Sequence, residues 1–125
     1  MNISEGVVEI TEKKQGEVLV IKMRGRLDAF SSPQAEKKVF ECINRGDTKL
    51  LIDFGGIQYL SSAGMRMLLS TTKKLKTLSG KLVVCSVIPN VMDVLKMSGF
   101  DHVLELSKTE EDALGKFNGV NSKSG

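Results

Sequence analysis

The fold is decided by LLIDF, the short apolar run at residues 50–54, after which Gly55 and Gly56 are expected to end a strand. A short apolar run that stops at turn residues is typical of a strand covered on both faces, as in a parallel sheet. A second run of this kind, LVVCSV, occupies residues 82–87. Because parallel strands need a crossover connection, the two runs predict a sheet whose strands alternate with helices.

The segments before and after these strands show the spacing of apolar residues that is typical of helices. Between residues 35 and 43 apolar side chains recur at i, i+4, i+7 and i+8, the stripe of an amphipathic helix. Ser31 or Ser32 is expected to cap this helix, with Pro33 at its first position. Three more helices are predicted: one with its stripe over residues 65–75, a short one opened by Pro89, and one over residues 109–117 capped by Thr109.

The remaining segments complete the fold. Residues 7–11 and 17–23 are rich in β-branched residues and predict an N-terminal hairpin, residues 25–28 a loop, and residues 103–106 a last short strand. The predicted class is α/β: a mixed four- to five-stranded sheet covered by about four helices through right-handed crossovers. We expect one domain over residues 1–117 and a disordered tail over residues 118–125, which are small and polar.

Composition excludes several classes of function. The 125 residues include 18 Lys plus Arg and 15 Asp plus Glu, and the net charge of +3 is too small and dispersed for a nucleic-acid binder. Cys42 and Cys85 lie among apolar neighbours and are expected to be free thiols in a reducing compartment. With no leader and no long apolar stretch, we expect a cytoplasmic protein without a membrane segment.

Few residues could support catalysis. His102 is the only histidine, so zinc sites and Ser-His-acid hydrolases have few candidate ligands and bases. No phosphate-binding glycine loop is present, and we expect neither a cofactor nor a metal. We do not expect an enzyme, although one that uses carboxylates alone stays an open alternative.

Two adjacent serines stand where a predicted strand leads into the second main helix. Ser61 or Ser62 could cap that helix, and one hydroxyl is enough for this task. A hydroxyl at a helix N-terminus is also exposed, and a phosphate there is stabilised by free N–H groups and the helix dipole. The residues alone leave both interpretations open.

Several local signatures, in this order, resemble the STAS domain family, and within it the single-domain anti-sigma factor antagonists. The resemblance covers about residues 5–117. The segments that carry it are GRLD at 25–28, LIDF at 51–54, IQYLSSAG at 57–64, GKLVVC at 80–85 and VLKMSG at 94–99.

This resemblance implies partner switching. Such antagonists bind an anti-sigma factor that is also a serine kinase, which frees the sigma factor, and phosphorylation by that kinase releases the antagonist. The matching phosphoacceptor is Ser62, with Ser61 as second candidate, because Ser61 stands where the family places an Asp. Asp28 matches an acidic residue of the kinase-facing surface, although a purely local role in its turn is equally open.

The partner-binding set implied by the resemblance is Asp28, Ser61, Ser62, Gly64, Met65 and Arg66. Implied partners are the anti-sigma factor kinase and a serine phosphatase, with the chain itself a monomer or weak dimer. The alternative within the family is a STAS subunit of a lipid-transport or sensory complex that never switches.

Overall fold

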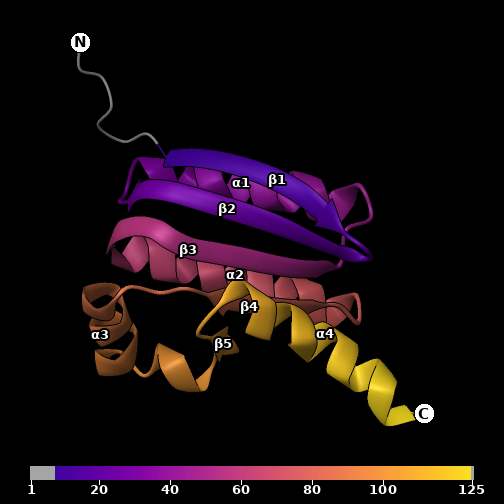
Figure 1. Cartoon of the computed structure of the whole chain (residues 1–125). Coiled ribbons are helices and arrows are strands. Elements are labelled where there is room, and N and C mark those ends of the chain that lie inside the picture. The colour runs from indigo at the N-terminus through magenta and orange to yellow at the C-terminus, as the bar shows by residue number, and fades with distance from the viewer. Residues whose placement is uncertain (1–7, 125) are drawn as a thin grey trace.

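The computed structural model describes residues 8–124, so Val7 of the predicted first strand lies outside the described residues. After an N-terminal hairpin of two strands, three further strands alternate with four helices (Figure 1). In chain order the elements are β1 Val8–Gln15, β2 Val18–Leu27, α1 Ser31–Asn44, β3 Lys49–Leu60, α2 Ser62–Thr77, β4 Lys81–Cys85, α3 Pro89–Met97, a 3₁₀ turn Phe100–His102, β5 Leu106–Ser107 and α4 Glu110–Ser124.

The strands form one sheet in the order β1-β2-β3-β4-β5, the same as their order in the chain. β1 and β2 pair antiparallel, and every later pair is parallel. The predicted α/β class, the mixed sheet and the N-terminal hairpin are therefore confirmed. Register pairs Leu27 at the end of β2 with Leu60 at the end of β3, so the two strands stop at the same edge of the sheet.

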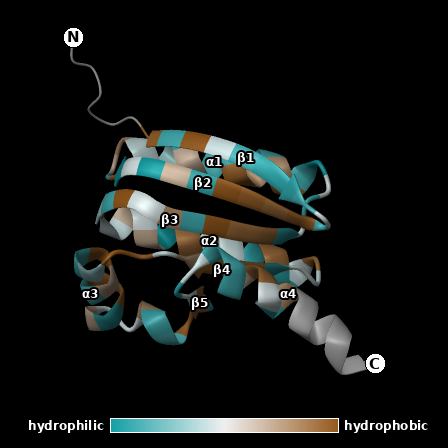
Figure 2. Cartoon of the chain, viewed as in Figure 1, coloured by the Kyte–Doolittle hydropathy of each residue, from teal (hydrophilic) through white to brown (hydrophobic). Residues whose placement is uncertain are grey.

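The larger core lies between the sheet and α1, α2 and α3. Alternate residues of the central strands point into it, including Leu19, Ile21 and Met23 of β2. Leu50, Ile52 and Phe54 of β3 do the same, and Figure 2 shows the hydrophobic band that these strands form. The predicted stripes of α1 and α2 face this core: Ala35, Val39, Cys42, Ile43, Met67, Leu68 and Leu75 are buried in it.

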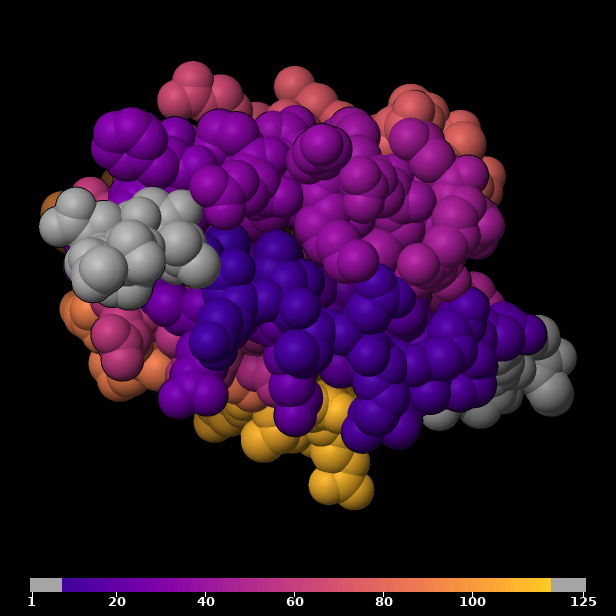
Figure 3. All heavy atoms as spheres, turned by 90° about the horizontal axis from the view of Figure 1, so that it is seen from above, coloured from indigo at the N-terminus to yellow at the C-terminus, as the bar shows by residue number. Residues whose placement is uncertain are grey.

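A smaller core lies on the opposite face of the sheet, under α4. It joins Val20, Leu51 and Val83 of the strands to Ala113 and Phe117 of the helix. Figure 3 looks onto the β1 edge and shows α1 on one side of it and α4 on the other. The sheet is thus covered on both faces, which explains why β3 and β4 read as continuous apolar runs.

Two predicted strand limits are wrong. β3 does not end at Gly55 but continues to Leu60, because Gly56 permits close approach of β2: a Cβ on Gly56 would lie 3.1 Å from the Arg24 Cα. Residues 25–27 form the end of β2 rather than a loop, since they pair with β3 after a shift in register. Both changes come from pairing between strands, which local sequence does not show.

Other boundaries also shift. α1 begins at Ser31, so Pro33 is its third helical residue and neither Ser31 nor Ser32 is the cap residue. β4 ends at Cys85, because Ser86 adopts a positive φ of 63°. The last strand is Leu106–Ser107, since Val103 and Leu104 donate backbone hydrogen bonds to the Phe100 carbonyl instead of joining the sheet.

The Thr109 cap of α4 is confirmed by a 3.0 Å hydrogen bond from the Asp112 N–H to its hydroxyl. α4 itself runs to Ser124, through residues for which the sequence predicts a disordered tail. The boundary at residue 117 stays a prediction. Cys42 and Cys85 are free and buried, as expected. None of the helices within residues 8–124 has the length and apolar character needed to cross a membrane.

Candidate functional site

The serine pair lies where β2 and β3 end and where α1 and α2 begin. We call this region the serine site and define it by Asp28, Phe30, Tyr59, Ser61, Ser62 and Arg66. These residues come from the connection after β2, the last residues of β3 and the first turns of α2. Because Leu27 pairs with Leu60, the segments that follow both residues start side by side.

Ser61 is the cap residue of α2, and its hydroxyl takes part in two hydrogen bonds. The hydroxyl accepts a hydrogen bond from the Gly64 N–H at 3.2 Å and donates one to the Leu27 carbonyl at 2.7 Å. The Ser61 N–H donates to the same carbonyl at 2.9 Å. Ser61 therefore performs the capping role that the sequence leaves open between the two serines.

Ser62 is the first helical residue of α2 and is exposed. Within residues 8–124, no hydrogen bond to or from its hydroxyl is present, in contrast to the hydroxyl of Ser61. The two serines thus differ in what their hydroxyls can do. The Ser62 hydroxyl is the one that an incoming enzyme or partner can reach without breaking the cap.

Asp28 organises the turn between β2 and α1. Its Oδ1 accepts hydrogen bonds of 2.9 Å from the N–H groups of Phe30 and Ser31, and one of 3.1 Å from the Ser31 hydroxyl. These bonds, led by that of the Ser31 N–H, lower the pKa of the Asp28 carboxyl from its ordinary value. Asp28 therefore stabilises its own turn through local hydrogen bonds, one of the two roles that the sequence leaves open. Asp28 also accepts hydrogen bonds from N–H groups at the start of α1, a task that the sequence assigns to a serine cap.

Gly64 and Met65, both in the predicted partner-binding set, face inward to different degrees. Gly64 is buried, and a Cβ there would lie 2.6 Å from a methyl carbon of Leu60 and 3.0 Å from the Leu27 Cβ. Met65 is half-buried against the larger core and accepts a 3.3 Å hydrogen bond from the Ser98 hydroxyl. Gly64 thus lets α2 approach the sheet and does not itself form part of the exposed surface.

Arg66 is exposed one helical turn after Ser62. In the described part of the chain it forms no ion pair. The helix that carries it has no acidic residue, so no side chain of α2 can neutralise the Arg66 guanidinium.

Two aromatic residues of the serine site were not predicted to have a role. Phe30 is 77% exposed, and Tyr59 is 40% exposed with the Arg26 guanidinium 4.2 Å from the centre of its ring. Large apolar side chains left in solvent are informative where they gather near a reactive group. Phe30 could have been suspected from its polar neighbours in DAFSS, but the exposure of Tyr59 depends on the register of β3.

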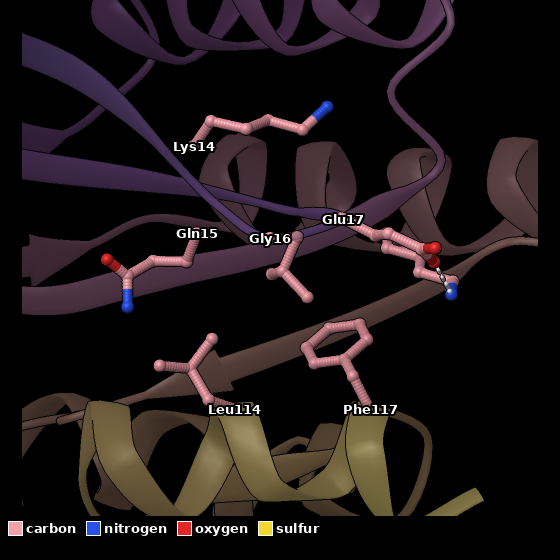
Figure 4. A pocket seen from close by; sticks show the side chains of 8 residues that line it. Lys14, Gln15, Gly16, Glu17, Leu114 and Phe117 are labelled. Atoms are coloured by element: carbon pink, nitrogen blue, oxygen red, sulfur yellow. Dashed lines mark hydrogen bonds and ion pairs between the residues drawn. The ribbon is translucent and has the colours of Figure 1, made fainter. Parts of the chain in front are cut away.

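A hollow of about 610 Å³ lies at the opposite end of the sheet, where β2 and β3 begin. Figure 4 shows Leu114 and Phe117 of α4 across from Gly16 in the hairpin turn. A 2.6 Å ion pair between Lys49 and Glu17 lies at its rim. No Ser, Thr, Cys or His lines the hollow, and no three metal-ligating side chains gather anywhere among the described residues.

Comparison with known proteins finds relatives of similar sequence that are named anti-sigma factor antagonists. BtrV of Bordetella bronchiseptica, named a putative anti-sigma factor antagonist, is 28% identical over 110 residues, which cover 88% of this chain and 95% of BtrV. An anti-sigma F factor antagonist of Paenibacillus polymyxa is 28% identical over 98 residues, covering 78% of this chain and 84% of that protein.

The same fold is found in the anti-sigma factor antagonist SpoIIAA of Bacillus. Its unphosphorylated form matches with a TM-score of 0.68 at 21% identity, covering 89% of this chain and 99% of SpoIIAA. Its phosphorylated form matches with a TM-score of 0.67 at 22% identity, covering 87% and 99%. The family model of the STAS domain matches residues 9–113, so the resemblance seen in the sequence is confirmed and the chain belongs to the STAS domain family.

Proposed function

We propose that this protein is an anti-sigma factor antagonist that binds an anti-sigma factor with serine kinase activity and is released when Ser62 is phosphorylated. The observation that carries the proposal is the difference between the two serines. Ser61 holds the α2 cap with its hydroxyl, whereas Ser62 exposes a hydroxyl with no partner in the described residues. One site thus combines a fixed helix start with an available acceptor.

Relatives support this assignment. The Paenibacillus relative is named an anti-sigma F factor antagonist, and SpoIIAA is known in phosphorylated and unphosphorylated forms. On this proposal the protein works in the cytoplasm as a binding protein rather than an enzyme. A serine phosphatase would restore the binding form.

The covalent step is a phosphoryl transfer. The Ser62 Oγ attacks the γ-phosphorus of ATP, the bond from that phosphorus to the β-γ bridging oxygen breaks, and ADP leaves. The hydroxyl proton passes to a base of the kinase. The product carries about −1.5 to −2 additional charges at Ser62, which offset half or more of the chain's net charge of +3.

Phosphorylation would act at the interface rather than on the fold. A helix N-terminus accommodates an anion, so α2 keeps its place after the modification. Phe30, Tyr59 and Arg26 are exposed on the segments that meet at the serine site, where a partner would cover them. A phosphate between two docked surfaces must be desolvated and meets any acidic group of the partner, which weakens the complex.

The test is a kinase assay with mass spectrometry. Wild type, Ser62→Ala and Ser61→Ala are mixed with a candidate anti-sigma factor kinase and ATP, and phosphate is mapped. We expect modification of wild type and Ser61→Ala at Ser62 and none of Ser62→Ala. Phosphate that persists on Ser62→Ala would contradict the assignment.

A companion binding experiment uses Ser62→Asp. This variant is expected to bind the kinase more weakly than wild type while its melting curve is unchanged. If the affinity for the partner changes neither with ATP nor in Ser62→Asp, the result would instead indicate the non-switching STAS subunit of a lipid-transport or sensory complex.

A further inference from the structure

Arg66 has no acidic side chain paired with it among the described residues. It is exposed, forms no ion pair within the described residues, and has the uncharged Leu69 and Ser70 at the i+3 and i+4 positions that follow it. The rest of α2 adds lysines but no Asp or Glu. Nothing on its own helix can therefore neutralise the guanidinium.

Helix geometry directs Arg66 toward Ser62. Residues four apart lie on the same face of a helix, and Ser62 and Arg66 have this spacing within α2. Side chains in a helix also lean toward its N-terminus, so a residue covers the surface over the turn before it. The spacing therefore places the long Arg66 side chain on the same helix face as Ser62, within reach of a group carried by that serine.

The backbone donors at the start of α2 are partly used. The Gly64 N–H is bonded to the Ser61 hydroxyl, and the Met65 N–H donates to the Ser61 carbonyl at 3.0 Å. Of the first four N–H groups, only those of Ser62 and Ala63 lack a hydrogen-bond partner in the described residues. A phosphate has three acceptor oxygens, so a guanidinium nearby could add charged donors to these two N–H groups.

We propose that Arg66 holds the phosphate of phosphorylated Ser62 through a charge-assisted pair inside α2. This inference rests on the proposed function, because it assumes that Ser62 receives the phosphate. The pairing itself makes and breaks no covalent bond. It assigns Arg66 a positioning role: the guanidinium orients the phosphate along α2 and favours its dianion over its monoanion.

The test needs no kinase. The full chain is produced with phosphoserine incorporated at position 62, and the second ionisation of the phosphate is followed by phosphorus NMR. We expect the phosphate pKa to be lower in wild type than in Arg66→Gln by about 0.3 of a unit or more, the size of an i, i+4 ion pair. Arg66→Lys should keep part of this difference. Lys76→Gln, which removes a cation from the far end of the same helix, should titrate as wild type does.

The result can overturn the inference without touching the proposed function. If Arg66→Gln and wild type titrate alike, or if Lys76→Gln shifts as much as Arg66→Gln, Arg66 does not hold the phosphate. If unphosphorylated Arg66→Gln then loses kinase binding, Arg66 contacts the partner instead, and the inference fails while the antagonist role stands. Failure of the proposed function is a separate outcome, since it appears as absence of phosphate on wild type treated with kinase.

Discussion

Ser61 and Leu27 are joined by two hydrogen bonds to one carbonyl oxygen, of 2.9 Å from the Ser61 N–H and 2.7 Å from its hydroxyl. The bonds fasten the start of α2 to the end of β2, which lies 34 residues earlier in the chain. The position of Ser62 is therefore set by its neighbour rather than by its own contacts. This relationship assigns the capping role to Ser61 and leaves Ser62 free for the acceptor role that we propose for it.

Stability should distinguish the two serines. Ser61→Ala removes the cap and is expected to lower the free energy of unfolding by about 1 kcal/mol or more. Ser62→Ala removes a hydroxyl without a partner and should change it by less than about 0.5 kcal/mol. Urea unfolding at neutral pH measures both values, and equal losses would show that the cap is not carried by Ser61.

Gly64 should not tolerate a side chain. Gly64→Ala places a Cβ 2.6 Å from Leu60 Cδ1 and 3.0 Å from Leu27 Cβ, and we expect a loss of about 1–3 kcal/mol despite the better helix propensity of Ala. Gly115→Ala in α4 is the matched control, since no atom lies within 4 Å of its added Cβ. The control should gain about 0.5–1 kcal/mol in urea unfolding. A neutral Gly64→Ala would mean that α2 can move away from the sheet.

Acid should remove the contribution of Asp28. Its pKa is lowered in the folded state from 3.8, chiefly by the hydrogen bond from the Ser31 N–H. This stabilisation is therefore complete above the unfolded pKa and is lost as the pH falls through the folded one. The difference in free energy of unfolding between wild type and Asp28→Asn should shrink as the pH is lowered from about 6 to about 3. A difference that does not change with pH would refute this origin of the shift.

Phe30 should matter for binding and not for folding. Because its ring is 77% exposed in the serine site, Phe30→Ser is expected to weaken kinase binding about tenfold or more, as loss of an aromatic anchor does. Leu78→Ser is the control: Leu78 is 45% exposed but lies after the last residue of α2, at the far end from Ser62. Calorimetric titration measures both affinities. Similar losses for the two variants would point to a general effect of surface polarity.

The sequence predicts the layers of the fold well, because the buried face of each helix or strand shows as a regular spacing of apolar residues within that segment. The stripe of α1 and the apolar run of β3 face the core as expected. Segment ends are predicted less well. Gly55 and Gly56 look like a stop when β3 is read alone, yet the strand continues since its partner β2 reaches as far as Leu27.

The sequence also points to the candidate site, because the signals for it lie within a single segment. A serine pair before a helix is a local signal, and so is a resemblance carried by consecutive residues. Which serine caps α2 depends on the Leu27 carbonyl, and the exposure of Tyr59 depends on cross-strand register. These facts involve segments more than 30 residues apart, so periodicity and spacing could not supply them.

The order of the strands across the sheet, identical to their order in the chain, bears on how the molecule can form during synthesis. Each strand from β2 onward joins an edge that the preceding strand already provides, and none has to insert between two partners. The sheet can therefore grow from the N-terminus in the order in which its strands are synthesised. The two hydrogen bonds between Ser61 and Leu27 lie within the first half of the sequence, so the start of α2 can be fastened to β2 before β4 and β5 join the sheet.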